Sequence, residues 1–215
     1  MEVLFERPDG VSIASLTTLA EIEELICLFE QVSQLEQWQP DGELRHYMQN
    51  SLFLAATAKR HLAGGIHLVR PSTAGHLPIH IRWPEVRCST RPNAAHIVVM
   101  AIQEKYRGHP SLFWSMAAEV WRYCWKERIS ELWLEVTPRT LKVYRRIGWP
   151  IEARGPARIH WGEECLPGCV RLEEVACTIL ERAVHSEFYR DVVRQACRTE
   201  QRDDANALCN VCNRI

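Results

Sequence analysis

Short apolar runs alternate along this chain with longer stretches in which apolar residues recur at helical spacing. The short runs, at residues 2–5, 51–58, 62–69, 95–102 and 131–136, favour β-strands. The longer stretches, at residues 16–35, 110–128 and 173–197, repeat apolar residues every three or four positions, as helices do. A further short helix is predicted from Thr137 to Arg146, stopped by Gly148 and Pro150.

Turn residues mark the connections between these elements. Lys59-Arg60 predicts a hairpin tip, and Gly64-Gly65 predicts a bulge or a close approach of two backbones. Residues 70–84, rich in Pro, Ser, Thr and Gly, predict an irregular stretch. We expect residues 1–198 to form a single domain and the polar residues 199–215 to form a flexible tail.

The segment of residues 94–150 predicts a crossover unit, because a strand, a loop and a helix lead to a second strand. Such a connection implies parallel pairing, whereas the hairpin before it implies antiparallel pairing. The chain is therefore predicted to be an α/β protein with a central mixed sheet and flanking helices. The loop before the long helix contains Arg107-Gly108, and a helix N-terminus after such a loop favours a phosphate group.

Charge and composition exclude several classes of function. With 26 Lys+Arg against 27 Asp+Glu, the chain lacks the positive excess that nucleic-acid binding requires. No apolar run is long enough to span a membrane, and residues 1–10 do not have the pattern of a secretory signal. We expect a cytoplasmic protein that does not bind nucleic acid and does not span a membrane.

The nine cysteines are expected to be mostly free thiols. Two close pairs, Cys165-x3-Cys169 and Cys209-x2-Cys212, could together supply four thiolates to zinc. Neither pair lies in a recognisable zinc-knuckle sequence, so no metal is expected.

Three motifs between residues 98 and 150 carry a family resemblance. The run at residues 98–102, then Tyr106-Arg-Gly108, and finally Val143-Tyr-Arg-Arg-Ile-Gly-Trp-Pro150 resemble the signature of the GCN5-related N-acetyltransferase (GNAT) superfamily. The resemblance implies a GNAT-like acyl-CoA N-acyltransferase fold. Its central strand would splay at a bulge and leave a backbone N–H near Met100 or Ala101 for the thioester carbonyl.

The same resemblance implies the donor: acyl-CoA, or the phosphopantetheine of an acyl carrier protein. The residues that would bind it are Met100, Ala101, Ile102, Arg107, Gly108, His109 and Ser111. Pro110 stands where the family usually has a second Gly, and it cannot donate an N–H.

A narrower resemblance is to the acyl-homoserine lactone (autoinducer) synthases of quorum sensing. It rests on Arg146-Ile-Gly-Trp-Pro150 followed by Gly155-Pro156, and on Gly65-x-His67-Leu-x-Arg70-Pro-x-Thr73. The Glu-x-x-Arg-Phe of those synthases aligns with His96-Ile-Val-Val-Met100.

Acyl transfer to an amine needs a neutral amine, a stabilised oxyanion and a proton for the leaving thiolate. By resemblance Tyr144 is the general acid, although an aromatic residue packing its helix on the sheet is an equal interpretation. His96 and Glu135 are the alternative bases, and either could relay a proton through water. A histidine on an apolar strand is more often a core residue.

Tryptophans recur along the predicted helix 110–128. Trp114, Trp121 and Trp125 lie seven and four residues apart, on one face. One interpretation is the wall of a tunnel for a long acyl chain, with Trp114, Trp121 and Trp149 as substrate-binding residues. The simpler interpretation is a helix-on-sheet core.

The predicted function is the transfer of an acyl group from a thioester to a small amine, without a covalent enzyme intermediate. Its leading version is acyl-homoserine lactone synthase-like, with an amino acid as a possible acceptor. The alternatives are a short-chain N-acetyltransferase that uses acetyl-CoA, and a non-catalytic protein that binds an acyl thioester or a partner.

Overall fold

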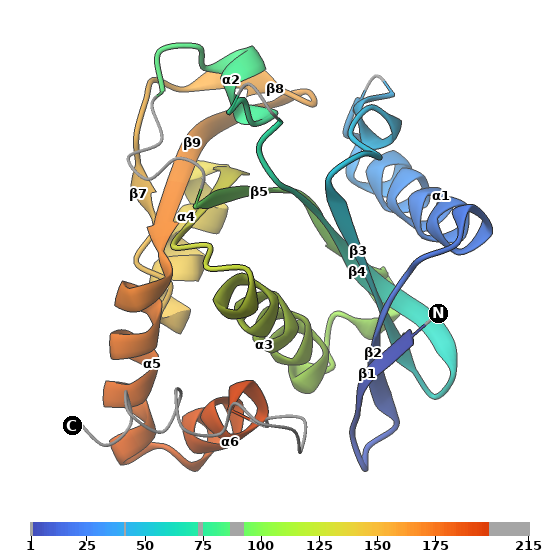
Figure 1. Ribbon diagram of the computed structural model, residues 1–215, viewed down its shortest axis with the longest axis vertical. Helices are drawn as coiled ribbons and strands as arrows, with labels where there is room; N and C mark the ends of the chain where they lie inside the picture. Colours follow the sequence, from blue (N-terminus) through green and yellow to red (C-terminus); the bar gives the residue numbers. More distant parts are fainter. Residues whose placement is uncertain (1, 41, 73–74, 87–92, 198–215) are drawn as a thin grey trace.

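The structure is a computed structural model that describes residues 2–40, 42–72, 75–86 and 93–197. A twisted sheet runs through the molecule with helices on both faces (Figure 1). Its strands are β1 (Glu2–Glu6), β2 (Val11–Ser15), β3 (Ser51–Ala58), β4 (His61–Val69), β5 (Ala94–Ile102), β6 (Glu131–Val136), β7 (Glu152–Ala153), β8 (Arg158–His160) and β9 (Glu163–Arg171). They lie in the order β1-β2-β3-β4-β5-β6-β9-β7, with β8 beside β9. Between the described strands only β5 and β6 pair in parallel, which confirms the predicted mixed sheet and crossover.

The helices are α1 (Leu19–Glu36), α2 (Ile79–Arg82), α3 (Pro110–Lys126), α4 (Pro138–Ile147), α5 (Leu172–His185) and α6 (Glu187–Ala196). Two short 3-10 turns, Glu43–Arg45 and Glu104–Tyr106, lie in the connections before β3 and before α3. A capping box starts α1, because the Thr18 side chain accepts from the Glu21 N–H while the Glu21 carboxylate accepts from the Thr18 N–H. Thr137 caps α4 as predicted, accepting from the Thr140 N–H.

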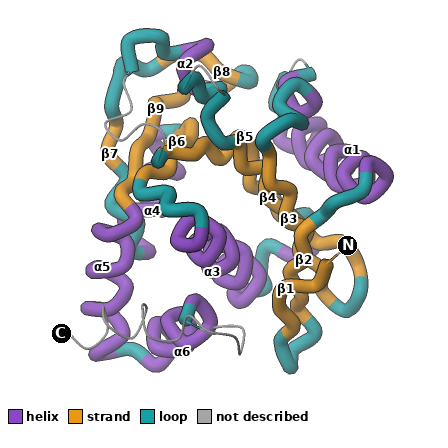
Figure 2. Tube along the Cα trace, in the orientation of Figure 1, coloured by secondary structure: helices purple, strands orange, loops and turns teal. Residues whose placement is uncertain are grey.

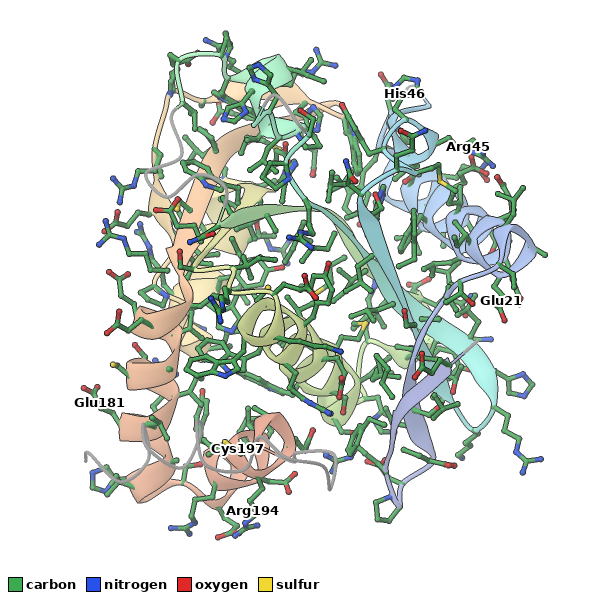
Figure 3. All side chains as sticks on the ribbon, in the orientation of Figure 1. Glu21, Arg45, His46, Glu181, Arg194 and Cys197 are labelled. Atoms are coloured by element: carbon green, nitrogen blue, oxygen red, sulfur yellow. The ribbon has the colours of Figure 1, made fainter. Side chains whose placement is uncertain are left out.

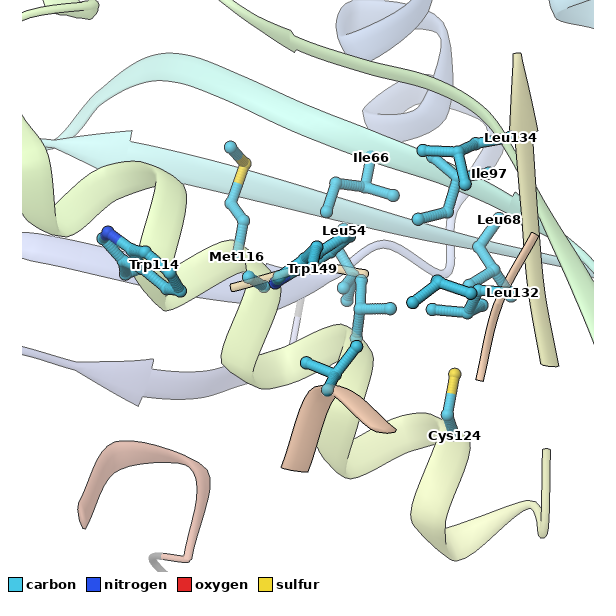
Figure 4. Packing of buried hydrophobic residues seen from close by; sticks show 14 of the residues in the cluster. Leu54, Ile66, Leu68, Ile97, Trp114, Met116, Cys124, Leu132, Leu134 and Trp149 are labelled. Carbon is cyan, nitrogen blue, oxygen red and sulfur yellow. The ribbon is translucent and has the colours of Figure 1, made fainter. Parts of the chain in front are cut away.

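The two faces of the sheet have separate apolar cores. On one face α1 packs Leu25 and Phe29 against Phe53 of β3. On the other face α3 packs Leu112 and Met116 against the strands, and Figure 4 shows Met116 pointing from the helix toward the strand that carries Ile66. Figure 2 shows the same layering, with α1 and α3 in purple on opposite sides of the orange strands.

The glycine and hairpin predictions between β3 and β4 are confirmed. Lys59 and Arg60 both have positive φ, 50° and 68°, at the hairpin tip. A Cβ on Gly64 would lie 2.5 Å from the Ala101 carbonyl oxygen, and one on Gly65 would lie 2.5 Å from the Leu54 carbonyl oxygen. Both positions therefore need glycine, because the neighbouring backbones leave no room for a side chain.

Three sequence predictions are wrong in detail. Strand β2 was missed because its five residues lie directly before the helix, and α2 interrupts the stretch predicted to be irregular at residues 70–84. The predicted helix 173–197 is two helices, because Ser186 takes an extended conformation and lets α6 turn back against α3. The predicted tail, residues 199–215, lies outside the described residues. Within the described part of the chain, no helix has the length and apolar character needed to cross a membrane.

Candidate functional site

Strand β5 has a bulge where it parts from β6. His67 of β4 pairs with Val99 and Leu68 pairs with Ile97, so Val98 has no partner on β4. The bulge reverses the alternation of side chains, because Ile97 belongs to the core under α3 whereas Val99 belongs to the core under α1. The pairing of β5 with β6 covers only residues 94–97. The end of β5, residues 98–102, is therefore an open strand edge on the β6 side.

The hydrogen bonds to β4 determine which backbone groups of β5 point to this open edge. Gln103 N donates to the Ala63 carbonyl over 2.8 Å, and successive residues of a strand point their backbone groups in opposite directions. The backbone N–H and C=O of Ala101 therefore point to β4, while those of Met100 and Ile102 point to the open edge. Consistent with this, the Ile102 carbonyl accepts from Arg107 Nε at 3.2 Å. Of the two residues predicted to offer a backbone N–H, Met100 has the suitable orientation.

The two alternative bases of the sequence analysis form one hydrogen-bonded pair. His96 Nε2 lies 2.8 Å from Glu135 Oε2, and the His96 side chain is 1% exposed. Burial alone would raise the pKa of Glu135, but the proximity and hydrogen bond of His96, with His160 nearby, lower it below its usual value. Because an ionised carboxylate only accepts, His96 carries its proton on Nε2. Its Nδ1 has no hydrogen-bond partner among the described residues.

Tyr144 lies on the other face of the sheet, in an aromatic group with Phe113 and Trp149. Its ring stacks on Trp149 with centroids 5.6 Å apart and an interplanar angle of 21°. The end of α4 explains this stacking. Gly148 takes a φ of 101° there, and the Trp149 N–H donates back to the Tyr144 carbonyl. The Tyr-x3-Gly-aromatic motif thus fixes Trp149 over Tyr144. Burial raises the pKa of Tyr144 to about 12, so its hydroxyl is protonated at neutral pH.

The loop before α3 has an open backbone at Gly108. A Cβ on Gly108 would meet no atom within 4 Å, and this glycine is not among those with positive φ. The fold itself therefore does not require glycine here, and the Gly108 backbone is open to the solvent side of the loop. Arg107 is engaged within the protein, because its Nη2 lies 2.6 Å from Glu36 Oε1.

A carboxylate that the sequence analysis missed lies at the first turn of α3. Ser111 Oγ donates to Asp9 Oδ2 over 2.8 Å, so His109 Nδ1, 2.9 Å from the same hydroxyl, must be the donor in that contact. Burial alone would raise the pKa of Asp9, but hydrogen bonds from Ser111, the Val11 N–H and Arg7 lower it. A phosphate bound at this turn would have an ionised carboxylate as its neighbour. No sequence signal linked the β1–β2 hairpin to this loop.

An apolar pocket of about 430 Å³ lies between α3, α5 and α6. It is lined by the three tryptophans predicted to bind substrate, by Trp125 and by aliphatic residues of the two C-terminal helices: Trp114, Trp121, Trp149, Trp125, Leu172, Ala176, Ile179 and Val192. Cys197, which is labelled beside α6 in Figure 3, is also one of the lining residues. Trp114 and Trp149 belong to the core as well, so the core and tunnel interpretations are compatible. The volume is in the range of small-molecule sites.

The structure brings the predicted residues together in three groups. His96 and Glu135 form a pair on the face of the sheet opposite α3, Tyr144 joins Trp149 on the α3 face, and the loop residues lie at the start of α3. The first two groups therefore lie on opposite faces of the sheet. In the described ranges no group of three or more His, Cys, Asp or Glu could hold a metal ion, and Cys209 and Cys212 lie outside those ranges.

Comparisons with known proteins give a match through structure alone, since neither protein-family models nor curated sequences match this chain. The N-acyl amino acid synthase FeeM from uncultured soil microbes is similar over 82% of this chain and 98% of its own, with a TM-score of 0.65 and 16% identity. The CoA-dependent acyl-homoserine lactone synthase BjaI, solved with SAM and isopentyl-CoA, is similar over 82% and 92%, with a TM-score of 0.59 and 17% identity. A GNAT-family acetyltransferase from Staphylococcus aureus Mu50 is similar over 75% of this chain and 99% of its own, with a TM-score of 0.53 and 16% identity.

These likenesses confirm the fold that the sequence motifs predicted. The chain has the N-acyltransferase fold of the GCN5-related superfamily, in a form similar to acyl-homoserine lactone synthases and an N-acyl amino acid synthase.

Proposed function

We propose that the protein is an N-acyltransferase that moves an acyl group from an acyl thioester directly to a small amine. The observation that carries this proposal is the open edge of β5, which begins beside the His96–Glu135 pair on one face of the sheet, whereas Tyr144 packs on the other face. A thioester laid along that edge would have a base on one face of the sheet and an acid on the other. Solved structures with this fold include enzymes of this reaction class.

The steps follow from the geometry. The amine attacks the thioester carbonyl carbon, and the Met100 N–H stabilises the negative charge that forms on the carbonyl oxygen. His96 Nδ1 takes a proton from the attacking nitrogen, and the Glu135 carboxylate stabilises the imidazolium that results. The C–S bond then breaks, and Tyr144 donates a hydrogen bond or a proton to the departing sulfur.

The donor is proposed to be a long-chain acyl thioester of CoA or of an acyl carrier protein. The apolar pocket supports a long chain, because Trp149 both stacks on Tyr144 and lines the pocket, so a chain could pass from one to the other. A short-chain acetyltransferase would have no use for that volume. Asp9 at the α3 turn favours a donor that places fewer phosphate charges there, such as a carrier protein arm.

The acceptor is proposed to be an amino acid or a related small amine. Solved structures of this form include both an N-acyl amino acid synthase and lactone synthases. By the motif resemblance, His96 stands where the lactone synthases have glutamate. The experiment is an assay of free thiol with acyl-CoA donors from acetyl to hexadecanoyl, tested with the standard L-amino acids and with S-adenosylmethionine. Mass spectrometry then identifies the N-acyl product. Binding of a donor without thiol release from any amine would favour the non-catalytic alternative, to which Pro110 also points.

A further inference from the structure

His67 of β4 is a fully buried histidine with one ring nitrogen in use. Its side chain is 0% exposed, and its ring stacks on Phe53 with centroids 4.2 Å apart. Nε2 lies 2.9 Å from Ser51 Oγ, and Ser51 donates its single proton to the Tyr47 carbonyl. His67 must therefore donate from Nε2, which leaves Nδ1 as a bare lone pair. In the described part of the chain nothing bonds to that Nδ1.

His96 has the same arrangement on the neighbouring strand. Its Nε2 donates to Glu135, and its Nδ1 is buried without a partner in the described residues. Buried polar atoms without a hydrogen bond are rare in native proteins and call for a physical reason. Two such acceptors on adjacent strands can be satisfied together by one small molecule that brings two hydrogen-bond donors.

The two rings lie on one face of the sheet. His96 pairs with Val69, and His67 is two residues before Val69 on the same strand, so the histidines are diagonal neighbours. Nε2 of His67 contacts Ser51 on the β3 side, and Nε2 of His96 contacts Glu135 on the β6 side. The two Nε2 atoms are therefore directed away from each other. Burial, and after it the proximity of His96, lowers the pKa of His67 to about 3, which keeps its ring neutral.

We propose that His67 binds the acceptor, with Nδ1 of His67 and Nδ1 of His96 accepting two N–H groups of one primary amine. His67 holds the nitrogen in place, while His96 removes the proton that becomes acidic as the C–N bond forms. A neutral primary amine has two N–H groups and fits both acceptors. A neutral secondary amine has one, so His67 also selects for primary amines. The inference rests on the proposed function only for the role of this amine as the acyl acceptor.

A binding experiment tests the pair without catalysis. The protein labelled with ¹⁵N-histidine is titrated with ethylamine, which has N–H donors, and with tetramethylammonium, which has none. We expect both histidines to be protonated on Nε2 and both Nδ1 resonances to shift with ethylamine alone. Equal responses to the two compounds, a shift at His96 only, or Nδ1-protonated rings would overturn the proposal.

Matched variants separate the two nitrogens of His67. His67→Asn can place an amide oxygen near the position of Nδ1, whereas His67→Gln reaches Ser51 but removes the Nδ1 acceptor. For the best amine of the product assay, we expect KM to rise about tenfold in His67→Gln, with little change in His67→Asn or in donor binding. Equal effects of both variants, at matched unfolding midpoints, would show a packing role only. If the wild-type protein acylates no amine, the proposed function fails, while the ethylamine titration still decides the role of His67.

Discussion

His96 and Glu135 form a hydrogen bond of 2.8 Å between adjacent strands at the point where β5 and β6 stop pairing. His96 pairs with Trp133, and Glu135 is two residues further along β6. The carboxylate therefore lies beyond the last paired residues, close to the open edge of β5. This relationship makes Glu135 the residue that holds the proposed base in its working tautomer.

Replacing Glu135 with Gln should therefore lower kcat/KM by about 100-fold, because a neutral amide can orient the ring but cannot stabilise an imidazolium. The dissociation constant of the donor, measured by calorimetry, should not change. The exposed Glu164→Gln on β9 is the matched control. Full activity in Glu135→Gln would remove this pair from the mechanism.

Replacing Tyr144 with Phe should keep the stacking on Trp149 and remove the proton donor. Among the described residues no hydrogen bond reaches the Tyr144 hydroxyl, so the unfolding midpoint should stay the same. Thiol release should slow by about 10- to 100-fold. Because burial raises the pKa of Tyr144 to about 12, the hydroxyl of the wild-type protein should cause no break in its rate profile between about pH 7 and pH 9. Wild-type rates in Tyr144→Phe would leave only the packing role.

Two glycine variants should have opposite effects. Gly108→Ala should leave the free energy of unfolding within about 0.5 kcal/mol of wild type but weaken donor binding, because the Cβ occupies open space on the loop. Gly148→Ala should lower the free energy of unfolding by about 1–2 kcal/mol, since Gly148 has a φ of 101° and a Cβ there would lie 3.0 Å from Ile179 Cδ1. Urea unfolding and calorimetry with CoA measure both effects. A Gly108→Ala protein that binds CoA normally would exclude this loop from the donor site.

Filling the apolar pocket should change the preferred donor. Ala176 of α5 lines the pocket, so Ala176→Trp should reduce turnover of long-chain donors while acetyl-CoA is still used. Val184→Trp is the control, because Val184 is 65% exposed on the same helix. A series of donors of increasing chain length gives the comparison. The same chain-length profile in both variants would contradict an acyl site between α3, α5 and α6.

The stability of the protein should depend on pH through His67. Burial, followed by the proximity of His96, lowers the pKa of His67 to about 3, whereas an unfolded histidine has a pKa of about 6.5. Below about pH 6.5 the unfolded chain binds a proton that the folded chain does not, so stability falls as the pH falls towards 3. Through His67 alone, the free energy of unfolding should fall by about 2 kcal/mol between about pH 7 and pH 5. Urea unfolding should show a flatter pH dependence in His67→Asn, and parallel curves would contradict the buried neutral ring.

The sheet and the main helices were predictable because each buries a face that repeats along the sequence. Strand β2 and the break at Ser186 were not, because both depend on tertiary packing: β2 completes the sheet beside β3, and α6 turns back onto α3. The motif residues Tyr144, Gly148 and Trp149 were recognisable because a helix end and a ring stack are formed within a few residues of sequence.

The pairing of His96 with Glu135 was beyond the reach of the sequence, although both residues were candidates. They are 39 positions apart, and their contact depends on the register of two strands joined by a helix. The bulge at Val98 could not be predicted for the same reason, since it depends on the register of β5 with β4. Asp9 and the role of His67 likewise depend on which strands become neighbours.

The most direct test of the account is the stoichiometry of thiol release against N-acyl product, measured for the wild-type protein with a long-chain acyl thioester and its best amine. Direct acyl transfer predicts that thiol appears only when a primary amine is present, with one N-acyl product for each thiol. Thiol release that does not depend on the amine, or a donor that binds and stays intact with every amine, would contradict direct acyl transfer.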